Sequence, residues 1–289
     1  MAATGNQPMS NTAAADPRAN RPEYVLGAGD DELQRLGLQH RLWSDESNRI
    51  WRDAGFGPGQ TILDVGSGPG FASFDLSPLL EPEGRLIAID ESQRYIDFLN
   101  TEAERRAITN ITASVGDAQA IDLPPESIDG AWERWVMCFT PNPGAVVKGV
   151  AKALKPGGVF ATQEYFNYRA LTLAPHTELF EPVKHAIRES WLDYGGDDDI
   201  AGKLPRLMRE AGLEVIETRP IARIARPGEA MWRWPSSYFE VFLPKIVEEG
   251  YLKEAERAAF MDEWARRSED PNCYFCTPPM VAILARKPK

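Results

Sequence analysis

The chain has few of the residues that usually build metal and thiol sites. It contains 3 cysteines and 3 histidines among 289 residues. Cys273 and Cys276 form a C-x-x-C pair, whereas a structural zinc site needs four ligands. Redox motifs of this spacing open a helix, but here Thr277-Pro278-Pro279 leads into an apolar, strand-like run. We therefore predict no metal site and no redox role for these thiols.

Long apolar runs and an excess of basic charge are also lacking. No apolar stretch approaches the roughly 18 residues that a membrane-spanning helix needs, and residues 1–22 lack the basic-then-apolar order of a secretory leader. The composition of these 22 residues, rich in Ala, Asn, Pro and Gly, predicts a disordered tail. With 32 basic against 43 acidic side chains, the net charge of -11 disfavours nucleic acid as a partner. We expect a cytoplasmic protein that acts on a small molecule and has neither a nucleic-acid nor a membrane partner; these features leave the oligomeric state open.

The most informative motif is a predicted strand that ends in a glycine-rich turn. Residues 62–70 read ILDVGSGPG, an apolar run followed by an acid and three glycines at alternate positions. Glycine permits positive φ and a close approach of the main chain to a ligand, and a helix that follows offers unpaired N–H groups. A dinucleotide-binding turn has the spacing G-x-G-x-x-G, so the third glycine here comes one residue early. The pattern predicts a site for a small, nucleotide-like molecule.

Acids follow the next two predicted strands. An apolar segment at 85–89 ends in Asp90 and Glu91, and Asp90 lies 20 residues past the last glycine of the turn. A carboxylate at this position can accept hydrogen bonds from both hydroxyls of a ribose. A third strand is predicted at 111–115, and Asp117 after it can accept from the exocyclic amine of an adenine. Because the carboxyl ends of parallel strands share one edge of the sheet, we expect these acids to line one crevice.

In combination these motifs resemble the class I S-adenosylmethionine-dependent methyltransferases, in particular the bacterial small-molecule group of the ubiquinone/menaquinone-methyltransferase type. The resemblance covers roughly residues 24–287. Residues 128–135 resemble the fourth strand of that family and its exit, and LKPGG at 154–158 resembles the turn before the fifth strand. Many relatives carry two histidines just after the fourth strand, where this chain has Cys138 and Phe139. We therefore do not expect this chain to use a histidine base at that point, as those relatives could.

The resemblance implies an α/β fold, a Rossmann-like, doubly wound and mostly parallel seven-stranded sheet with an antiparallel last strand and a helical, aromatic cap. We predict one methyltransferase domain over residues 23–289, with cap elements at about 24–55, 170–200 and 225–265. The patterning of apolar residues predicts helices at 30–54, 171–194 and 200–211, and strands at 213–220 and 279–287.

Two further features are open to a structural or a functional interpretation. Asp197-Asp198-Asp199 precedes a predicted helix, and we interpret these acids as favouring the helix start over a divalent-metal site. The aromatic stretch from Met231 to Phe242 either closes over an apolar substrate or packs the cap on the sheet. The sequence leaves both interpretations of this stretch open.

The resemblance implies transfer of a methyl group from S-adenosylmethionine to a small organic acceptor, at O, N or C, by in-line displacement, and we expect an acceptor from specialised metabolism. The candidate cofactor-binding residues are Asp64, Gly66, Ser67, Gly68, Gly70, Asp90, Glu91, Asp117, Ala118, Arg134, Gln39 and Tyr24. The candidate substrate-binding residues are Trp135, Phe139, Tyr165, Phe166 and His40. No catalytic residue is assigned, because Glu133, Glu164, His40 and Tyr165 are alternatives for a base. Two other functions stay open: binding of S-adenosylmethionine without methyl transfer, and a nicotinamide-dependent oxidoreductase, which the glycine spacing disfavours.

Overall fold

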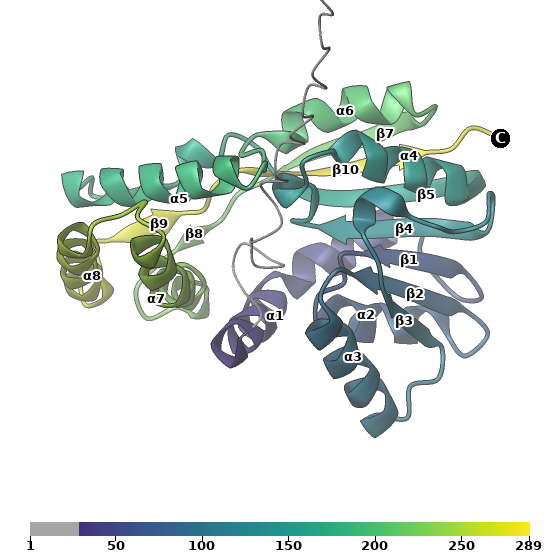
Figure 1. Cartoon of the computed structure of the whole chain (residues 1–289), viewed down its shortest axis with the longest axis horizontal. Coiled ribbons are helices and arrows are strands. Elements are labelled where there is room, and N and C mark those ends of the chain that lie inside the picture. The colour runs from purple at the N-terminus through teal and green to yellow at the C-terminus, as the bar shows by residue number, and fades with distance from the viewer. Residues whose placement is uncertain (1–28) are drawn as a thin grey trace, which may run out of the picture.

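The structure is a computed structural model, and it describes residues 29–289 (Figure 1). The tail predicted over residues 1–22 and the cofactor candidate Tyr24 lie outside the described residues.

A seven-stranded sheet with the order β3-β2-β1-β4-β5-β10-β7 organises the described chain. Its strands are β1 (Thr61–Val65), β2 (Arg85–Asp90), β3 (Ile111–Val115), β4 (Ile128–Arg134), β5 (Leu154–Tyr165), β7 (Glu214–Ile221) and β10 (Met280–Arg286). Strands β1 to β5 pair in parallel, whereas β10 runs antiparallel to both β5 and β7. This arrangement confirms the predicted fold class, including the antiparallel last strand.

Helices cover both faces of this sheet. They are α1 (Asp30–Asp53), α2 (Phe71–Leu76) and α3 (Gln93–Arg105) on one side, and α4 (Pro143–Ala153) and α6 (Ile200–Glu210) on the other (Figure 1). Ser92 accepts a hydrogen bond from the Tyr95 N–H at the start of α3, and Asn142 accepts from the Ala145 N–H at the start of α4. Because the sheet is covered on both faces, β1 and β4 bury most of their side chains.

The cap lies beside the sheet, at the left of Figure 1. It consists of α5 (Glu181–Asp193), α7 (Arg233–Glu248), α8 (Glu254–Ser268) and a three-stranded sheet of β6 (Thr172–Ala174), β9 (Tyr274–Cys276) and β8 (Ile224–Ala225). The helix predicted over 171–194 is therefore wrong at its beginning. Residues 172–174 pair with β9, and this pairing partner about a hundred residues away leaves no periodic signal in the local sequence.

The three consecutive aspartates directly precede α6, as our interpretation expected, but they do not cap it through side-chain hydrogen bonds. Asp199 occupies the N-cap position of α6 without a side-chain capping bond, and its carboxylate accepts instead from the Asn167 N–H at 2.8 Å. Asp198 is buried and accepts from Arg188 Nε at 2.8 Å. Asp197 pairs with Lys203. These acids hold the segment between α5 and α6 against its neighbours.

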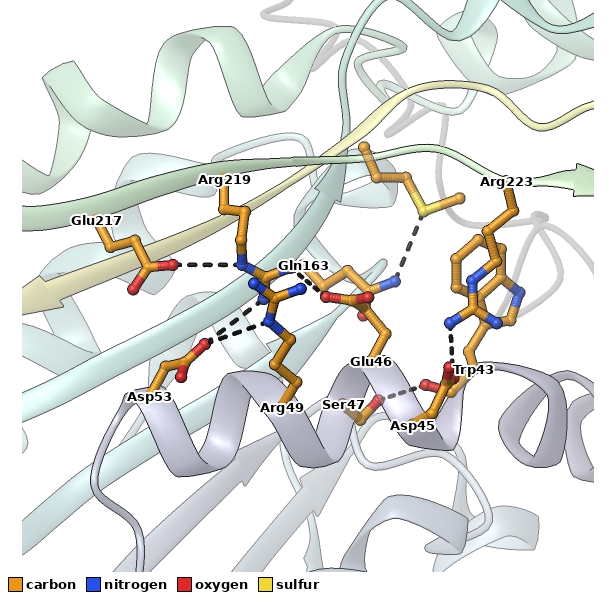
Figure 2. Close-up of polar contacts among 11 residues, drawn as sticks. Trp43, Asp45, Glu46, Ser47, Arg49, Asp53, Gln163, Glu217, Arg219 and Arg223 are labelled. Carbon is orange, nitrogen blue, oxygen red and sulfur yellow. Dashed lines mark hydrogen bonds and ion pairs between the residues drawn. The ribbon is translucent and has the colours of Figure 1, made fainter.

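Ion pairs fasten α1 to the antiparallel side of the sheet (Figure 2). Arg219 of β7 pairs with Glu46 of α1, and the two side chains are 16% and 13% exposed. Arg223, just after β7, donates to Asp45 at 2.6 Å and to the Leu42 carbonyl at 2.7 Å. Its guanidinium also lies 4.5 Å from the centre of the Trp43 ring. These contacts fix where α1 crosses the carboxyl ends of the strands.

Replacement of Arg219 by methionine tests this attachment. The Arg219→Met variant leaves the Glu46 carboxylate largely buried without its cation, so we expect a loss of roughly 1–3 kcal/mol in the free energy of unfolding. Arg49→Met is the matched control, because Arg49 is 55% exposed and 3.9 Å from Asp53, and should cost less than about 0.5 kcal/mol. Urea unfolding measures both, and equal losses would contradict the assignment.

Candidate functional site

The glycine-rich turn between β1 and α2 needs its glycines for two different reasons. Gly66, Gly68 and Gly70 have φ values of 62°, 54° and 82°, in the left-handed region that favours glycine. A Cβ on Gly66 would lie 2.4 Å from the Val136 side chain, and one on Gly70 would lie 2.4 Å from Leu99. A Cβ on Gly68 would meet nothing within 4 Å. The outer glycines thus permit close packing, and the middle one presents bare backbone to open space.

Asp90, at the end of β2, holds this turn in place. Its Oδ2 accepts from the Gly68 N–H at 2.7 Å and its Oδ1 accepts from the Ser92 N–H at 2.9 Å. Each carboxylate oxygen can accept a second hydrogen bond, so Asp90 is also able to bind ligand hydroxyls. Asp117, after β3, accepts from the backbone N–H of Gln119 at 2.8 Å.

A cavity of about 200 Å³, which we call the glycine-turn pocket, lies along these strand ends. Among the predicted residues it is lined by Gln39, His40, Asp64, Gly66, Ser67, Gly68, Asp90, Glu91, Asp117, Ala118, Arg134, Trp135 and Phe139. Gly70 is not in the lining, because it packs against Leu99. The sequence analysis missed Leu36, Phe71 and Tyr95 in the wall, whose helical positions resemble those of ordinary core residues.

Asp64 is buried near the carboxyl end of β1. Burial raises its pKa to about 7, although the Ser73 hydroxyl donates to its Oδ2 at 2.6 Å. The positive charge of the buried Arg134 guanidinium lowers the pKa of Asp64, but by less than burial raises it. Burial also lowers the pKa of Arg134 itself, to about 10. A carboxyl group so short of favourable charge is a suitable partner for a ligand cation.

His40 of α1 lines the pocket, but both of its ring nitrogens are occupied. Nε2 lies 2.9 Å from Asp75 Oδ2, and Nδ1 lies 3.2 Å from Arg134 Nη2. Because a guanidinium can only donate, Nδ1 must accept from Arg134, and the protonated Nε2 must donate a hydrogen bond to Asp75. Burial lowers the pKa of His40. The geometry makes His40 a neutral link between α1, α2 and β4, and it argues against His40 as the base.

A second cavity of about 40 Å³ adjoins the first, and we call it the aromatic pocket. Its lining is Arg35, Gln39, Trp135, Phe139, Tyr165, Tyr168, Leu171, Trp191, Trp234, Pro235, Tyr238, Phe239, Phe275 and Pro278. Gln39, Trp135 and Phe139 line both cavities, so the two meet at these side chains. The candidate Phe166 lines neither cavity and is 44% exposed.

The aromatic stretch from Met231 to Phe242 both lines a cavity and packs the cap. Trp234, Tyr238 and Phe239 line the aromatic pocket, whereas Trp232 stacks on Trp264 of α8 within the cap. Trp191 of α5 and Tyr168 were not among the candidates, because their segments contain no motif that points to the site. They reach it only through the packing of the cap over the strand ends.

Two buried glutamates stand behind this site, at the ends of β4 and β5. Glu164 Oε1 accepts from the backbone N–H groups of Met137 and Cys138 at 2.6 and 3.2 Å, and Glu133 Oε2 accepts from the Val136 N–H at 3.3 Å. Burial together with the mutual repulsion of the two carboxyl groups raises the pKa of Glu133 well above its usual range. The pair therefore keeps a proton and fixes the loop that carries Trp135 and Phe139.

The proton retained by the Glu133–Glu164 pair should make the free energy of unfolding depend on pH. Unfolded Glu133 ionises above about pH 4.3, while the folded protein keeps the proton, so this group lowers stability by about 1.4 kcal/mol per pH unit until its folded pKa is reached. The isosteric Glu133→Gln variant removes that contribution, and its stability relative to the native protein should rise from about pH 5 to pH 8. Urea unfolding across this range measures it, with the exposed Glu126→Gln as control. Parallel curves for the native protein and Glu133→Gln would refute the shared proton.

Within residues 29–289, no cluster of histidine, cysteine, aspartate or glutamate side chains is placed to hold a metal ion. None of the helices in the same range is long and apolar enough to cross a membrane.

Comparisons with known proteins agree with the geometry. Residues 57–212 match the family described as Methyltransferase domain. The chain is 24% identical over 274 residues to 27-O-demethylrifamycin SV methyltransferase of Amycolatopsis mediterranei, covering 89% of this chain and 92% of that protein. It is 28% identical over 193 residues to demethylmenaquinone methyltransferase of Lactococcus lactis, covering 62% of this chain and 74% of that protein.

Other matches are shorter or more distant. The chain is 29% identical over 177 residues to an uncharacterized 37.1 kDa transposon protein of Streptomyces fradiae, which covers 60% of this chain and 49% of that protein. Among solved structures, the (4+2)-cyclase SpnF superposes with a TM-score of 0.57 at 18% identity, covering 84% of this chain and 81% of that chain. The family match spans more than half of the 289 residues and contains the glycine turn together with Asp64, Asp90 and Asp117. The chain therefore belongs to the methyltransferase-domain family and is an S-adenosylmethionine-dependent methyltransferase.

Proposed function

We propose that this enzyme transfers the methyl group of S-adenosylmethionine, bound in the glycine-turn pocket, to a small organic acceptor bound in the aromatic pocket. The observation that carries the proposal is the junction of the two cavities at Gln39, Trp135 and Phe139. A cofactor and an acceptor on either side of this junction would meet away from bulk water, since the cap encloses the second cavity.

The residues of the glycine-turn pocket fit this cofactor. The bare backbone at Gly68 leaves room for an adenosyl group. Asp90 would accept from the ribose hydroxyls, Asp117 from the adenine amine, and buried Asp64 would receive the positive amino group. Gln39 lies at the junction, where the amino-acid end and the methyl group would be held.

The protein's contribution to the reaction is alignment and exclusion of water. S-adenosylmethionine supplies a methyl group activated by a sulfonium, so the chain has to hold the acceptor atom about 3–3.5 Å from it and in line. Aromatic rings at the junction would stabilise the positive charge of the sulfonium by roughly 0.5–2 kcal/mol. Glu133 and Glu164 line neither cavity, and the pKa of Tyr165 is raised well above its usual range by burial. No side chain is therefore assigned as a base.

Binding of the cofactor without methyl transfer is the second candidate function. One observation favours it: a (4+2)-cyclase shares the fold with a TM-score of 0.57. A nicotinamide-dependent oxidoreductase is disfavoured by the position of the third glycine and by the family match.

The strand-end acids should differ in their importance for cofactor binding. Asp90→Ala should weaken binding of S-adenosylhomocysteine roughly 100-fold, because it removes the ribose acceptor and the anchor of Gly68 together. Asp117→Ala should cost roughly fivefold, since water replaces a single acceptor at a loop. Isothermal titration calorimetry measures both. Asp90→Asn keeps the size of the side chain and separates lost charge from lost packing. Equal affinities for Asp90→Ala and Asp117→Ala would contradict the ranking.

Transfer itself is tested with methyl-labelled S-adenosylmethionine and a set of small phenols, quinols and amines. We expect label in an organic product together with an equal amount of S-adenosylhomocysteine, and none with Asp90→Ala. Tight cofactor binding without labelled product from any acceptor would favour the second candidate.

A further inference from the structure

The aromatic pocket has walls with little charge that a ligand could use. Arg35 is its charged side chain, and Glu32 accepts from the guanidinium at 2.7 and 2.6 Å. Arg35 also donates to Gln39 at 2.9 Å. Because burial of an unpaired charge is costly, an ionic ligand would gain little here to offset its lost hydration.

Trp135 is held in an unusual position at the entrance to this pocket. Its φ of 57° lies in the left-handed region, which a bulky residue adopts only when its surroundings impose it. Its backbone N–H donates to the Gln163 carbonyl at 3.1 Å. Its indole stacks on Tyr165 at 5.6 Å and 10°, and on Trp234 at 6.2 Å and 26°. Flat rings therefore form the walls on both sides of the junction.

Three polar groups of these walls lack partners. The indole N–H groups of Trp135 and Trp191 and the hydroxyl of Tyr238 are buried and have no hydrogen-bond partner among residues 29–289, and all three rings line the aromatic pocket. Trp135 is 7% exposed and Trp191 is 2% exposed. Trp191 is held by Phe139 at 4.7 Å and by Tyr168 at 4.5 Å. Buried donors without partners cost free energy that a ligand oxygen can recover.

We infer that the aromatic pocket selects an uncharged, planar acceptor whose oxygen accepts a hydrogen bond from the indole N–H of Trp191 or Trp135. This inference rests on the proposed function, because it assigns the aromatic pocket to the acceptor. A ring needs more room than about 40 Å³, since a cavity of about 150 Å³ holds benzene. The acceptor therefore enters as the cap shifts, and the bond from Trp234 Nε1 to Gln39 Oε1 at 3.0 Å, between α7 and α1, must give way or move.

The test uses naphthol as the probe, with S-adenosylhomocysteine saturating the glycine-turn pocket and calorimetry as the readout. Naphthalene lacks the oxygen, naphthoate carries a charge, and decahydronaphthol is not planar. We expect naphthol to bind about five- to tenfold more tightly than naphthalene, in keeping with one additional hydrogen bond, and more tightly than the other two.

Phenylalanine variants identify the donor. Trp191→Phe or Trp135→Phe removes stacking surface for both probes but the donor for naphthol alone, so it should abolish the preference for naphthol over naphthalene. Trp51→Phe is the matched control, because Trp51 also has a buried, unpartnered indole N–H within residues 29–289 but lines neither pocket. Equal binding of naphthol and naphthalene, tighter binding of naphthoate, or no effect of either variant would overturn the inference.

Titration of S-adenosylhomocysteine alone separates this inference from the proposed function. If it binds and no naphthalene derivative does, the acceptor class is wrong while cofactor binding stands. If it fails to bind, the assignment of the glycine-turn pocket is wrong, and the acceptor inference falls with it.

Discussion

The hydrogen bond from the Gly68 N–H to Asp90 is the interaction on which the site depends. It joins the turn after β1 to the end of β2, and it keeps the bare backbone of Gly68 facing the open pocket. The same turn touches Val136 through Gly66 and Leu99 through Gly70, so a shift of the turn would disturb the exit of β4 and the packing of α3. In the proposed function, this short segment of main chain would link cofactor binding to placement of the acceptor.

The aromatic pocket, which we propose as the acceptor site, is built by elements that come from distant parts of the sequence. Helix α1 carries Gln39 and crosses the strand ends, held there by Arg219 and Arg223 (Figure 2). Helices α5 and α7 bring Trp191 and Trp234 to the same place. The buried Glu133–Glu164 pair fixes the loop between them from behind. In the function that we propose, acceptor specificity would therefore lie in the cap and α1, whereas the ends of the sheet strands would supply the cofactor side.

The sequence predicted the features that depend on local motifs, and it missed those that depend on contacts between segments far apart in the chain. The glycine turn, Asp90 and Asp117 are local signals at strand ends, and the structure places all of them along one pocket. Strands β7 and β10 were also expected within a residue or two of their bounds, since their apolar patterns are clear. By contrast, β6 forms because of its partner β9, and Trp191 and Tyr168 reach the pocket only through cap packing. His40 looked like a possible base because the sequence does not show that Asp75 and Arg134 occupy its two nitrogens.

A crystal structure of the enzyme with bound S-adenosylhomocysteine is the most direct test of the account. It should show the ribose on Asp90, the adenine beside Asp117, and the sulfur directed toward Trp135 and Phe139 at the junction of the two pockets. An adenosyl group bound elsewhere, or a sulfur directed away from the aromatic pocket, would contradict the account.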